Sequence, residues 1–237
     1  MALRKDELNL NGLFLFQDPD TYCFGMDTVL LAHFARADRE TVLDLGTGNG
    51  ALPVLLSGLY TPKHITGIEL QPVLYENACL NVVANGLQDR VTLLQGDYKT
   101  PLVAEKAYTL VIANPPYYPV GSGTLGKNEI ANRARFELTA TIRDVIAVAK
   151  RALTADGRLC LVYRTRWETA LRQALAAQEL HSVRTCYVHP RADKKATLLL
   201  LEARLQAGEE TVLPPLYVHE KEGYTPQMAA IYQGELI

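Results

Sequence analysis

The chain contains few cysteines, no internal repeat and no long apolar run. Its apolar stretches fall short of the roughly 18–20 residues of a membrane-spanning helix. Its start, MALRKDELNL, lacks the apolar segment of a secretory signal. The four cysteines form no CxxC pair, so we expect a cytoplasmic protein with reduced thiols, no membrane segment and no metal site. The missing repeat period excludes a solenoid.

The composition is that of a globular protein, with 48% hydrophobic and 21% charged residues among 237. This length fits one domain, or one domain with an appendage. The net charge of −2 hides a basic block, because residues 127–204 hold 15 Lys and Arg against 8 Asp and Glu. Contact with a polyanion such as nucleic acid would require such a block, although solvated helix faces give the same pattern.

Strand-like and helix-like segments alternate along the chain. Strands are predicted at residues 41–45, 65–70, 91–94, 109–113, 158–163, 183–188 and 197–204, and helices at 51–59, 73–85, 136–153 and 168–178. Repeated strand–helix units predict a mostly parallel sheet with helices on both faces. The last two strands have no long helix between them and are expected to form an antiparallel pair at a sheet edge. Residues 1–40, with a helix at 26–34, are predicted to be an N-terminal extension packed on a domain spanning 41–237.

A glycine-rich segment, DLGTGNG at 44–50, follows the first predicted strand and opens a helix. Its glycines let the backbone approach a ligand, and the helix N-terminus offers free N–H groups. Gly46 and Gly48, with Ala51, also fit the dinucleotide-binding fingerprint. Asp44 favours S-adenosylmethionine (AdoMet), because a carboxylate there repels a pyrophosphate but attracts an ammonium and a sulfonium. A dinucleotide remains an alternative.

Two further carboxylates follow the second and third predicted strands. Glu69 ends the second strand, where an acidic side chain can accept both ribose hydroxyls of an adenosine. Asp97, after Gly96, can accept the exocyclic amine of the adenine, although a turn aspartate would also explain it. Both residues predict a nucleoside site without choosing between the two cofactors.

Asn114, Pro115, Pro116 and Tyr117 follow the fourth predicted strand and open a loop that extends to residue 135. The prolines fix the backbone, and the Asn114 amide and Pro115 carbonyl oxygens provide two acceptors for one –NH2 group. Accepting both hydrogens favours a pyramidal nitrogen, whose lone pair then points at a methyl donor. Tyr117 can stack on a planar substrate such as a nucleobase. The motif predicts methyl transfer to a planar amine, although a proline-rich turn has the same composition.

The glycine-rich segment and the Asn-Pro-Pro-Tyr motif together resemble those of the class I AdoMet-dependent amino-methyltransferases. These enzymes methylate N6 of adenine, N4 of cytosine, N2 of guanine or the side-chain amide of glutamine. From about residue 10 to residue 233, the chain resembles the bacterial tRNA1(Val) adenine-37 N6-methyltransferase family. Three more segments carry this resemblance: FGMDTVLLAH at 24–33, where the family commonly reads FGTDAVLL, VHPR at 188–191, and GYTP at 223–226.

The resemblance implies the class I methyltransferase fold, an α/β architecture with a mostly parallel seven-stranded sheet and helices on both faces. It implies S-adenosyl-L-methionine as cofactor, S-adenosyl-L-homocysteine as product, and no metal. The cofactor-binding residues that it implies are Asp27, Asp44, Gly46, Gly48, Glu69 and Asp97, with Asp27 and the preceding loop over the cofactor. The residues that it implies for holding the target adenine are Asn114, Pro115 and Tyr117.

The substrate implied by the resemblance is an RNA, with an adenine of the tRNA anticodon loop favoured. Arg133 and Arg135 follow the Asn-Pro-Pro-Tyr motif, and Arg164 and Arg166 follow the fifth predicted strand. Loops after these strands open on the ligand side of the sheet, so these arginines are candidates for contacts with RNA phosphates. The chain departs from the family at Phe136, where a histidine is common, and this bears on substrate choice more than on reaction type.

Several alternatives stay open at the level of sequence. Guanine N2-methylation of rRNA fits the same motif. Glutamine N5-methylation of a release factor fits it too, but that family carries a larger N-terminal helical domain. A non-catalytic AdoMet- or RNA-binding module is the alternative of another class, and a dehydrogenase is the weakest. The protein is expected to be a monomer or a homodimer.

Overall fold

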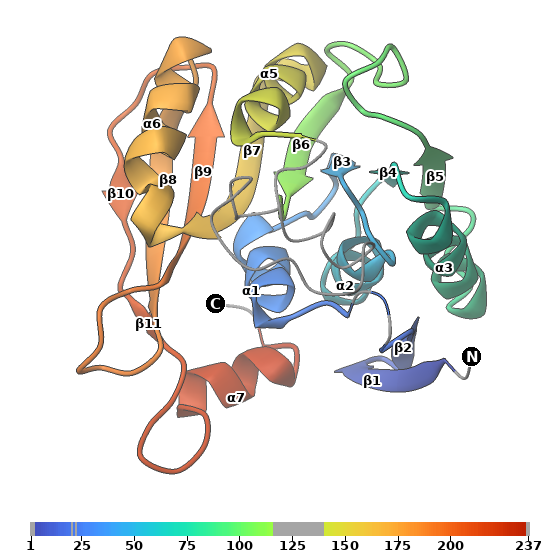
Figure 1. Cartoon of the computed structure of the whole chain (residues 1–237), viewed down its shortest axis with the longest axis horizontal. Helices are drawn as coiled ribbons and strands as arrows, with labels where there is room; N and C mark the ends of the chain where they lie inside the picture. The colour runs from blue at the N-terminus through green and yellow to red at the C-terminus, as the bar shows by residue number, and fades with distance from the viewer. Residues whose placement is uncertain (1–2, 20, 22, 116–139, 236–237) are drawn as a thin grey trace.

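Parallel strands form the centre of the computed structural model, which describes residues 3–19, 21, 23–115 and 140–235. The strands of the central sheet are β3 (Thr41–Leu45), β4 (His64–Glu69), β5 (Val91–Gln95), β6 (Tyr108–Ala113), β7 (Leu153–Arg164), β8 (His181–His189), β9 (Leu198–Arg204), β10 (Thr211–Val212) and β11 (Leu216–Tyr217). Their order is β10-β8-β9-β7-β6-β3-β4-β5, and β11 pairs with β8 (Figure 1). All seven predicted strands are confirmed. The sheet also contains β10 and β11, which were not predicted. Strands of two residues are too short to give a periodic pattern in the sequence.

The strand directions agree with the prediction of a mostly parallel sheet. β3 is parallel to β4 and β6, β4 to β5, and β6 to β7. β9 runs antiparallel between β7 and β8, and the two short strands run parallel to β8. The carboxyl ends of β3, β4, β5 and β6 therefore meet at one edge of the sheet, where ligands bind in such folds.

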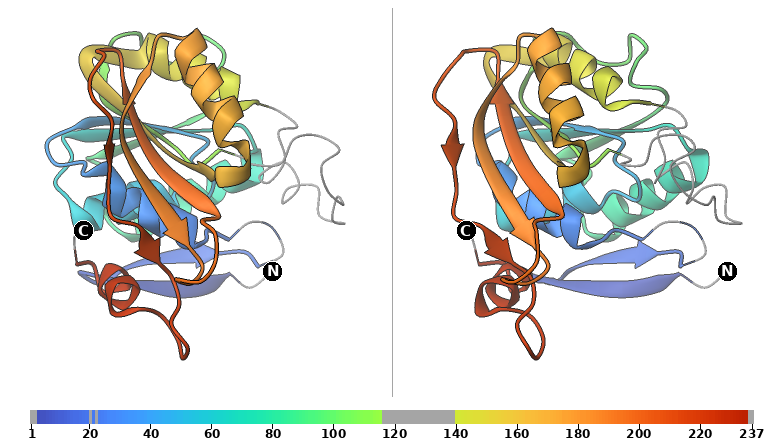
Figure 2. Two further views of the ribbon diagram at one scale, coloured as in Figure 1. Left: turned by 90° about the vertical axis from the view of Figure 1, so that its left-hand side faces the viewer. Right: turned by 60° about the vertical axis from the view of Figure 1, so that its left-hand side comes forward.

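Helices cover both faces of this sheet, as the strand–helix alternation predicts. They are α1 (Met26–Ala35), α2 (Ala51–Leu59), α3 (Pro72–Ala84), α5 (Ile142–Ala152), α6 (Glu168–Ala177) and α7 (Pro226–Tyr232), with a short 3-10 helix at Thr165–Trp167. Figure 2 shows α5 and α6 on one face of the sheet and α1 and α2 on the other. α1 packs on α2 and on β7, so it lies over the middle of the sheet.

Helix α5 is shorter than predicted at its N-terminus. Its cap is Thr141, whose hydroxyl accepts from the Asp144 N–H while the Asp144 carboxylate accepts from the Thr141 N–H, 2.8 Å away. This reciprocal capping box starts the helix at residue 142 instead of 136. Residues 136–139 of the predicted helix lie outside the described residues.

The junction between α5 and β7 also differs from the prediction. β7 begins directly at Leu153, five residues before the strand predicted at 158–163. Gly157 lies within the strand, where an added Cβ would come within 3.0 Å of the Tyr108 carbonyl oxygen. The glycine therefore serves a close approach to the start of β6.

The N-terminal segment forms a hairpin that the sequence analysis did not identify. β1 (Arg4–Leu10) and β2 (Leu13–Gln17) are antiparallel, and positive φ angles of 49° and 77° at Asn11 and Gly12 make the turn. An Asn-Gly pair between apolar residues is a hairpin signal in the sequence. The hairpin packs on α2 and α3 (Figure 1), and Leu15 within it is fully buried.

Asn81 of α3 and Asn85, which caps the C-terminus of α3, bond the free edge of β2 in place of another strand. Asn81 accepts from the Phe16 N–H at 2.7 Å and donates to the Phe16 carbonyl at 3.0 Å. Asn85 makes the same pair of bonds to Phe14, at 3.0 and 2.8 Å. Residues four apart share one face of a helix, and alternate residues share one edge of a strand, so the two spacings match. The amide pairs satisfy an edge that would otherwise be open.

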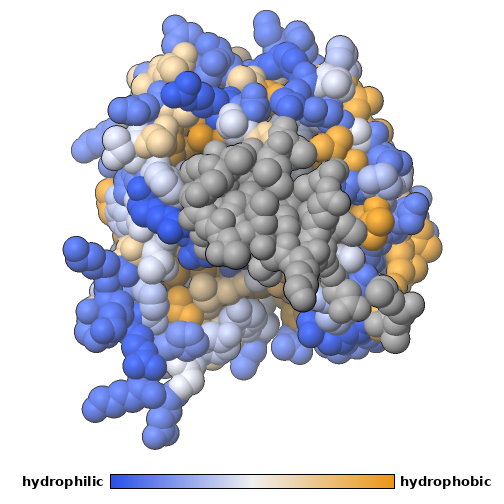
Figure 3. All heavy atoms as spheres, viewed as in Figure 1, coloured by the Kyte–Doolittle hydropathy of each residue, from blue (hydrophilic) through white to orange (hydrophobic). Residues whose placement is uncertain are grey.

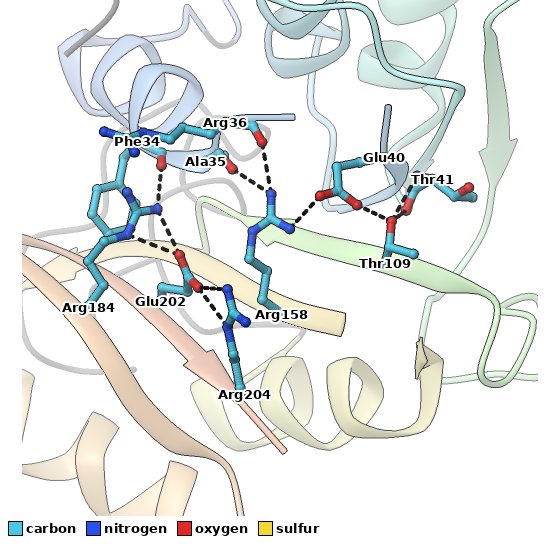
Figure 4. Close-up of polar contacts among 10 residues, drawn as sticks. All are labelled: Phe34, Ala35, Arg36, Glu40, Thr41, Thr109, Arg158, Arg184, Glu202 and Arg204. Carbon is cyan, nitrogen blue, oxygen red and sulfur yellow. Dashed lines mark hydrogen bonds and ion pairs between the residues drawn. The ribbon is translucent and has the colours of Figure 1, made fainter. Parts of the chain in front are cut away.

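An ion-pair network fastens the C-terminus of α1 at the amino edge of the sheet (Figure 4). The Arg158 guanidinium donates to the carbonyls of Ala35 and Arg36, at 3.1 and 2.8 Å, and pairs with Glu40 at 2.5 Å. Thr109 at the start of β6 donates to the same Glu40 carboxylate. The last carbonyls of a helix have no partner within the helix and carry partial negative charge, so a guanidinium there satisfies and stabilises them.

A second arginine completes this network from β8. Arg184 donates to the Phe34 carbonyl at 2.7 Å, and its guanidinium carbon lies 4.1 Å from the Phe34 ring centroid. Glu202, which is 5% exposed, pairs with Arg184 and with Arg204, both at 2.8 Å. Figure 4 shows these side chains gathered below the end of α1. Three arginines of the basic block therefore serve the fold at the edge opposite the ligand side.

Candidate active site

A cleft of about 900 Å³, including its open mouth, lies at the carboxyl ends of β3, β4 and β6. Phe24, Thr28, Asn49, Gln71 and Tyr98 contribute to its walls. Six predicted site residues also line it: Gly46, Gly48, Glu69, Asp97, Asn114 and Pro115. Its size and position suit a nucleoside-type ligand, since such pockets form outside the carboxyl ends of parallel strands.

The glycine-rich loop forms the floor between β3 and α2. Gly46 and Gly48 have φ angles of 76° and 60°, a region that favours glycine. The N–H groups of Gly46 and Thr47 both donate to the Ile68 carbonyl, at 3.0 and 2.9 Å, and tie the loop to the end of β4. A Cβ on Gly46 would meet no atom within 4 Å, so backbone conformation is what requires glycine at this position.

Glu69 links the glycine-rich loop to the turn after β4. One carboxylate oxygen accepts from the Gly48 N–H at 2.9 Å and the other from the Gln71 N–H at 2.8 Å. Burial raises the pKa of Glu69, and the backbone N–H groups oppose this rise. Each carboxylate oxygen has a second lone pair. The fixed Glu69 carboxylate therefore fits the predicted contact with a ribose diol.

Asp44 lies in β3 directly before the lining residues Leu45 and Gly46, and it is fully buried. Neither carboxylate oxygen has a hydrogen-bond partner among the described residues. Burial raises its pKa to about 7, the Thr47 hydroxyl opposes this rise, and the negative charge of Glu69 adds to it. A buried carboxylate without partners is costly, so this position fits a bound cation such as an ammonium or a sulfonium.

Asp97 and Asp27 occupy different surroundings. Asp97 lines the cleft after β5, accepts from the Lys99 N–H at 2.9 Å and pairs with the Lys99 ammonium at 3.4 Å. Asp27 lies in the first turn of α1, where it accepts from the Thr28 N–H at 2.9 Å, and it is not among the lining residues. Phe24 and Thr28, on either side of Asp27, do line the cleft. The segment before α1 therefore reaches the predicted cofactor site through these two residues.

Asn114 and Pro115 stand at the end of β6, on the opposite wall from Glu69. The Asn114 Nδ2 group donates to the Thr28 hydroxyl at 2.9 Å, and Thr28 is 3% exposed. This bond turns the Nδ2 side of the amide toward α1, so an incoming amine would meet Oδ1. Tyr117, the third predicted residue of the substrate site, lies outside the described residues, as do Arg133, Arg135 and Phe136.

The sequence analysis missed Thr28, which lines the cleft, and Gln17, which bonds two of the lining residues. The sequence motif around Asp27 marked the correct segment, but only helical phase would have placed Thr28 on the side that faces Asn114. Gln17 is 2% exposed and accepts from the Phe24 N–H at 3.0 Å and from the Asn49 side chain at 3.2 Å. No local pattern marks Gln17, because its partners are brought to it by the packing of the N-terminal hairpin.

The part of the chain that the structure describes contains neither a metal-binding cluster nor a membrane-spanning helix. No group of three or more His, Cys, Asp or Glu side chains within the described ranges could hold a metal ion. Of the helices in this part of the chain, none is long and apolar enough to cross a membrane.

Known sequences share the pattern of this chain over most of its length. The family model described as methyltransferase small domain matches residues 9–189. A tRNA1(Val) (adenine(37)-N6)-methyltransferase of Yersinia enterocolitica is 29% identical over 237 residues, covering 97% of this chain and 92% of the relative. The protein of the same name from Porphyromonas gingivalis is 28% identical over 212 residues, covering 84% and 82%.

Solved structures share the fold. A predicted O-methyltransferase from Agrobacterium tumefaciens has a TM-score of 0.71 at 21% identity, and the match covers 89% of this chain and 97% of that one. A geranyl diphosphate methyltransferase in complex with its substrate and sinefungin has a TM-score of 0.57 at 14% identity, covering 75% and 76%. At these identities the likeness concerns the architecture alone, which is the predicted class I methyltransferase fold.

Proposed function

The chain belongs to the methyltransferase small domain family, and on this premise we propose that it transfers a methyl group from AdoMet to N6 of an adenine in the anticodon loop of a tRNA. The observation that carries the proposal is the position of Asn114. Its amide stands beside Pro115 at the end of β6 in the same cleft as Glu69 and the glycine-rich loop. An acceptor for an amine and a site for a nucleoside cofactor therefore share one cavity.

The cofactor side of the cleft supplies charge and shape. The buried Asp44 carboxylate favours the cationic methionine part of AdoMet, Glu69 accepts the ribose hydroxyls, and Asp97 accepts from the adenine amine. The positive φ angles of Gly46 and Gly48 shape the backbone that follows β3. When bound, AdoMet supplies an activated methyl group on its sulfonium.

The substrate side of the cleft prepares the nitrogen for attack. The amine of adenine is planar and a poor nucleophile, because its lone pair is delocalised into the ring. Asn114 Oδ1 and the Pro115 carbonyl accept its two hydrogens and orient the lone pair toward the methyl group. The N–C bond forms as the S–C bond breaks, and one amine proton leaves afterwards to solvent. No covalent enzyme intermediate is required.

The choice of tRNA adenine rests on the relatives and on the general chemistry of RNA recognition. The two relatives named above are tRNA1(Val) (adenine(37)-N6)-methyltransferases, and they match 84% and 97% of this chain. A base must leave its stack to reach a recessed pair of acceptors, and bases in loops are already unstacked. Guanine N2 and the glutamine amide present the same –NH2 chemistry, so the test must include both.

A methyl-transfer assay tests this function. Purified protein and labelled AdoMet are incubated with tRNA, rRNA and a release factor, and the modified nucleosides or peptides are identified by mass spectrometry. We expect N6-methyladenosine in tRNA, with Asn114→Ala lowering the rate by about 100- to 1,000-fold, as the loss of one transition-state contact does elsewhere. Asn77→Ala, on α3 outside the cleft lining, is the matched control. Label found only in guanine or glutamine would refute the proposed substrate.

A further inference from the structure

We propose that a cleft beside the active site, at the end of β7, binds a phosphate of the RNA backbone next to the target base. This inference rests on the proposed function and names a contact that secures its substrate. The cleft has a volume of about 550 Å³, including its open mouth, and is lined by Arg164, Thr165, Arg166, Ala196 and Thr197. It therefore combines two guanidinium groups and the Thr197 hydroxyl in one recess, a donor set that suits a phosphodiester.

Strand register places this cleft within reach of the substrate amine. β6 and β7 are parallel neighbours in which Ala113 pairs with Leu161. Asn114 follows Ala113, and Arg164 lies three residues beyond Leu161 on the adjacent strand. Asn114 is therefore level with Val162, and at about 3.3 Å per residue Arg164 lies about 7 Å further along the strand direction. A nucleotide held at Asn114 can therefore place a neighbouring phosphate in the cleft.

The walls of the cleft are joined by hydrogen bonds within the protein. The Thr165 hydroxyl donates to the Ala196 carbonyl at 2.7 Å, and the Thr165 N–H donates to the Thr197 carbonyl at 3.2 Å. The end of β7 is thus fixed to the start of β9. Arg166 is exposed, and its guanidinium carbon lies 5.4 Å from the centroid of the Trp167 ring. A rigid recess with an arginine held over an aromatic ring loses little entropy when it binds a phosphate.

Three other arginines of residues 127–204 pair with carboxylates away from this cleft. Arg184 and Arg204 pair with Glu202 at the amino edge of the sheet. Arg172 pairs with Glu168 and Glu210 on the outer side of α6. The cleft at the end of β7 opens on the edge of the sheet that carries Asn114. In Figure 3 the side of the molecule over α6 and β8 is mainly hydrophilic, whereas apolar side chains gather on the opposite side, over α3.

RNA binding by arginine variants tests the cleft. The probe is an unmodified tRNA transcript with an adenine after its anticodon, titrated by fluorescence anisotropy at several salt concentrations. We expect Arg164→Gln and Arg166→Gln each to weaken binding by about 3- to 10-fold near 0.1 M salt. Each variant should also lower the salt slope, which is the slope of the logarithm of the binding constant against the logarithm of the salt concentration, by about one in magnitude. The matched control is Arg90→Gln, an exposed arginine just before β5 at the opposite edge. It should leave affinity and slope at their wild-type values.

A neutral backbone linkage identifies the phosphate concerned. A methylphosphonate placed on one side of the target adenine, and then on the other, removes one charge at a time. At one of the two positions wild-type binding should weaken, and Arg166→Gln should show no further loss there. Phosphate binding in the cleft is refuted if both arginine variants bind like wild type with an unchanged salt slope. It is also refuted if the methylphosphonate lowers the RNA affinity of the variant as much as that of the wild type.

The outcomes separate this proposal from the proposed function. If the tRNA is not methylated but the arginine variants still lose affinity and slope, the cleft stands and the assigned reaction fails. If methylation proceeds and the variants bind normally, the reaction stands and the cleft fails. Arg166→Gln should also raise KM for tRNA while kcat at saturating tRNA and AdoMet affinity stay near wild type, because Arg166 lies outside the active-site lining.

Discussion

Replacing Asp44 by asparagine should remove a pH dependence that the structure builds into the cofactor site. Asp44 is fully buried, its oxygens have no hydrogen-bond partner among the described residues, and its pKa rises from 3.8 to about 7. A shift of this size corresponds to about 4 kcal/mol of difference between the protonation states. The Asp44→Asn variant keeps the shape of the side chain and cannot ionise.

The sign of the effect on folding follows from the raised pKa. The folded protein without cofactor holds a proton on Asp44 up to about pH 7, whereas the unfolded chain releases it near pH 4. The Asp44 contribution to the free energy of unfolding is therefore largest below pH 4 and is lost as the pH rises to about 7. Between pH 5 and pH 8 only the part of this contribution above pH 5 is lost, so urea unfolding should show a steeper loss of stability for wild type than for Asp44→Asn, by about 3 kcal/mol.

Cofactor affinity should change with pH in the opposite direction. AdoMet is cationic and favours the ionised carboxylate, so its affinity for the wild type should rise about 20-fold between pH 5.5 and 7.5, where a model α-amino group stays largely protonated. Isothermal titration calorimetry measures this directly, and Asp44→Asn should bind more weakly with a nearly flat profile. Parallel profiles for the two proteins, in both binding and unfolding, would show that Asp44 does not control the site.

Two further predictions concern single hydrogen bonds. Thr28→Val removes the hydroxyl that accepts from the Asn114 amide, and it should lower kcat about 2- to 10-fold with AdoMet affinity unchanged. Thr28→Ser keeps the hydroxyl and should restore the wild-type kcat. Equal kcat values for the valine and serine variants would contradict the positioning role of Thr28. Asn81→Ala leaves the N–H and the carbonyl of Phe16 without their side-chain partner. This loss should lower the free energy of unfolding, measured by urea titration, by about 2–4 kcal/mol. An unchanged urea midpoint would show that water replaces the amide.

Periodicity was sufficient to predict the central sheet, because each of its seven longer strands lies between turn signals or helices. It failed where tertiary contacts override local signals. Asp156-Gly157 reads as a helix end, but Gly157 lies in β7 because it packs against the start of β6. The N-terminal hairpin carried a readable Asn-Gly turn, whereas β10 and β11 exist only because β8 offers them an edge.

The candidate site was predictable where its residues follow strand ends, since parallel strands bring their carboxyl ends together. Gly46, Glu69, Asp97 and Asn114 were identified in this way, and the structure gathers them in one cleft. Thr28 could not be identified so, because its contact with Asn114 depends on how α1 crosses the sheet. For the basic block the sequence left nucleic-acid contact and solvated helix faces open, and the structure places Arg158, Arg184 and Arg204 in ion pairs at the amino edge of the sheet. Charge counting does not distinguish arginines that fasten a helix from arginines that face a ligand.

Helix α1 connects the arginines at the amino edge of the sheet to the candidate site. Its first turn supplies Thr28 to Asn114 at the ligand edge, and its last carbonyls accept from Arg158 and Arg184 at the opposite edge. A helix of ten residues is about 15 Å long, so the network at one end fixes the position at which Thr28 meets the Asn114 amide. The arginine network is therefore remote from the reacting atoms but sets the position of a group that touches Asn114, because α1 is buried along most of its length and its two ends cannot shift independently.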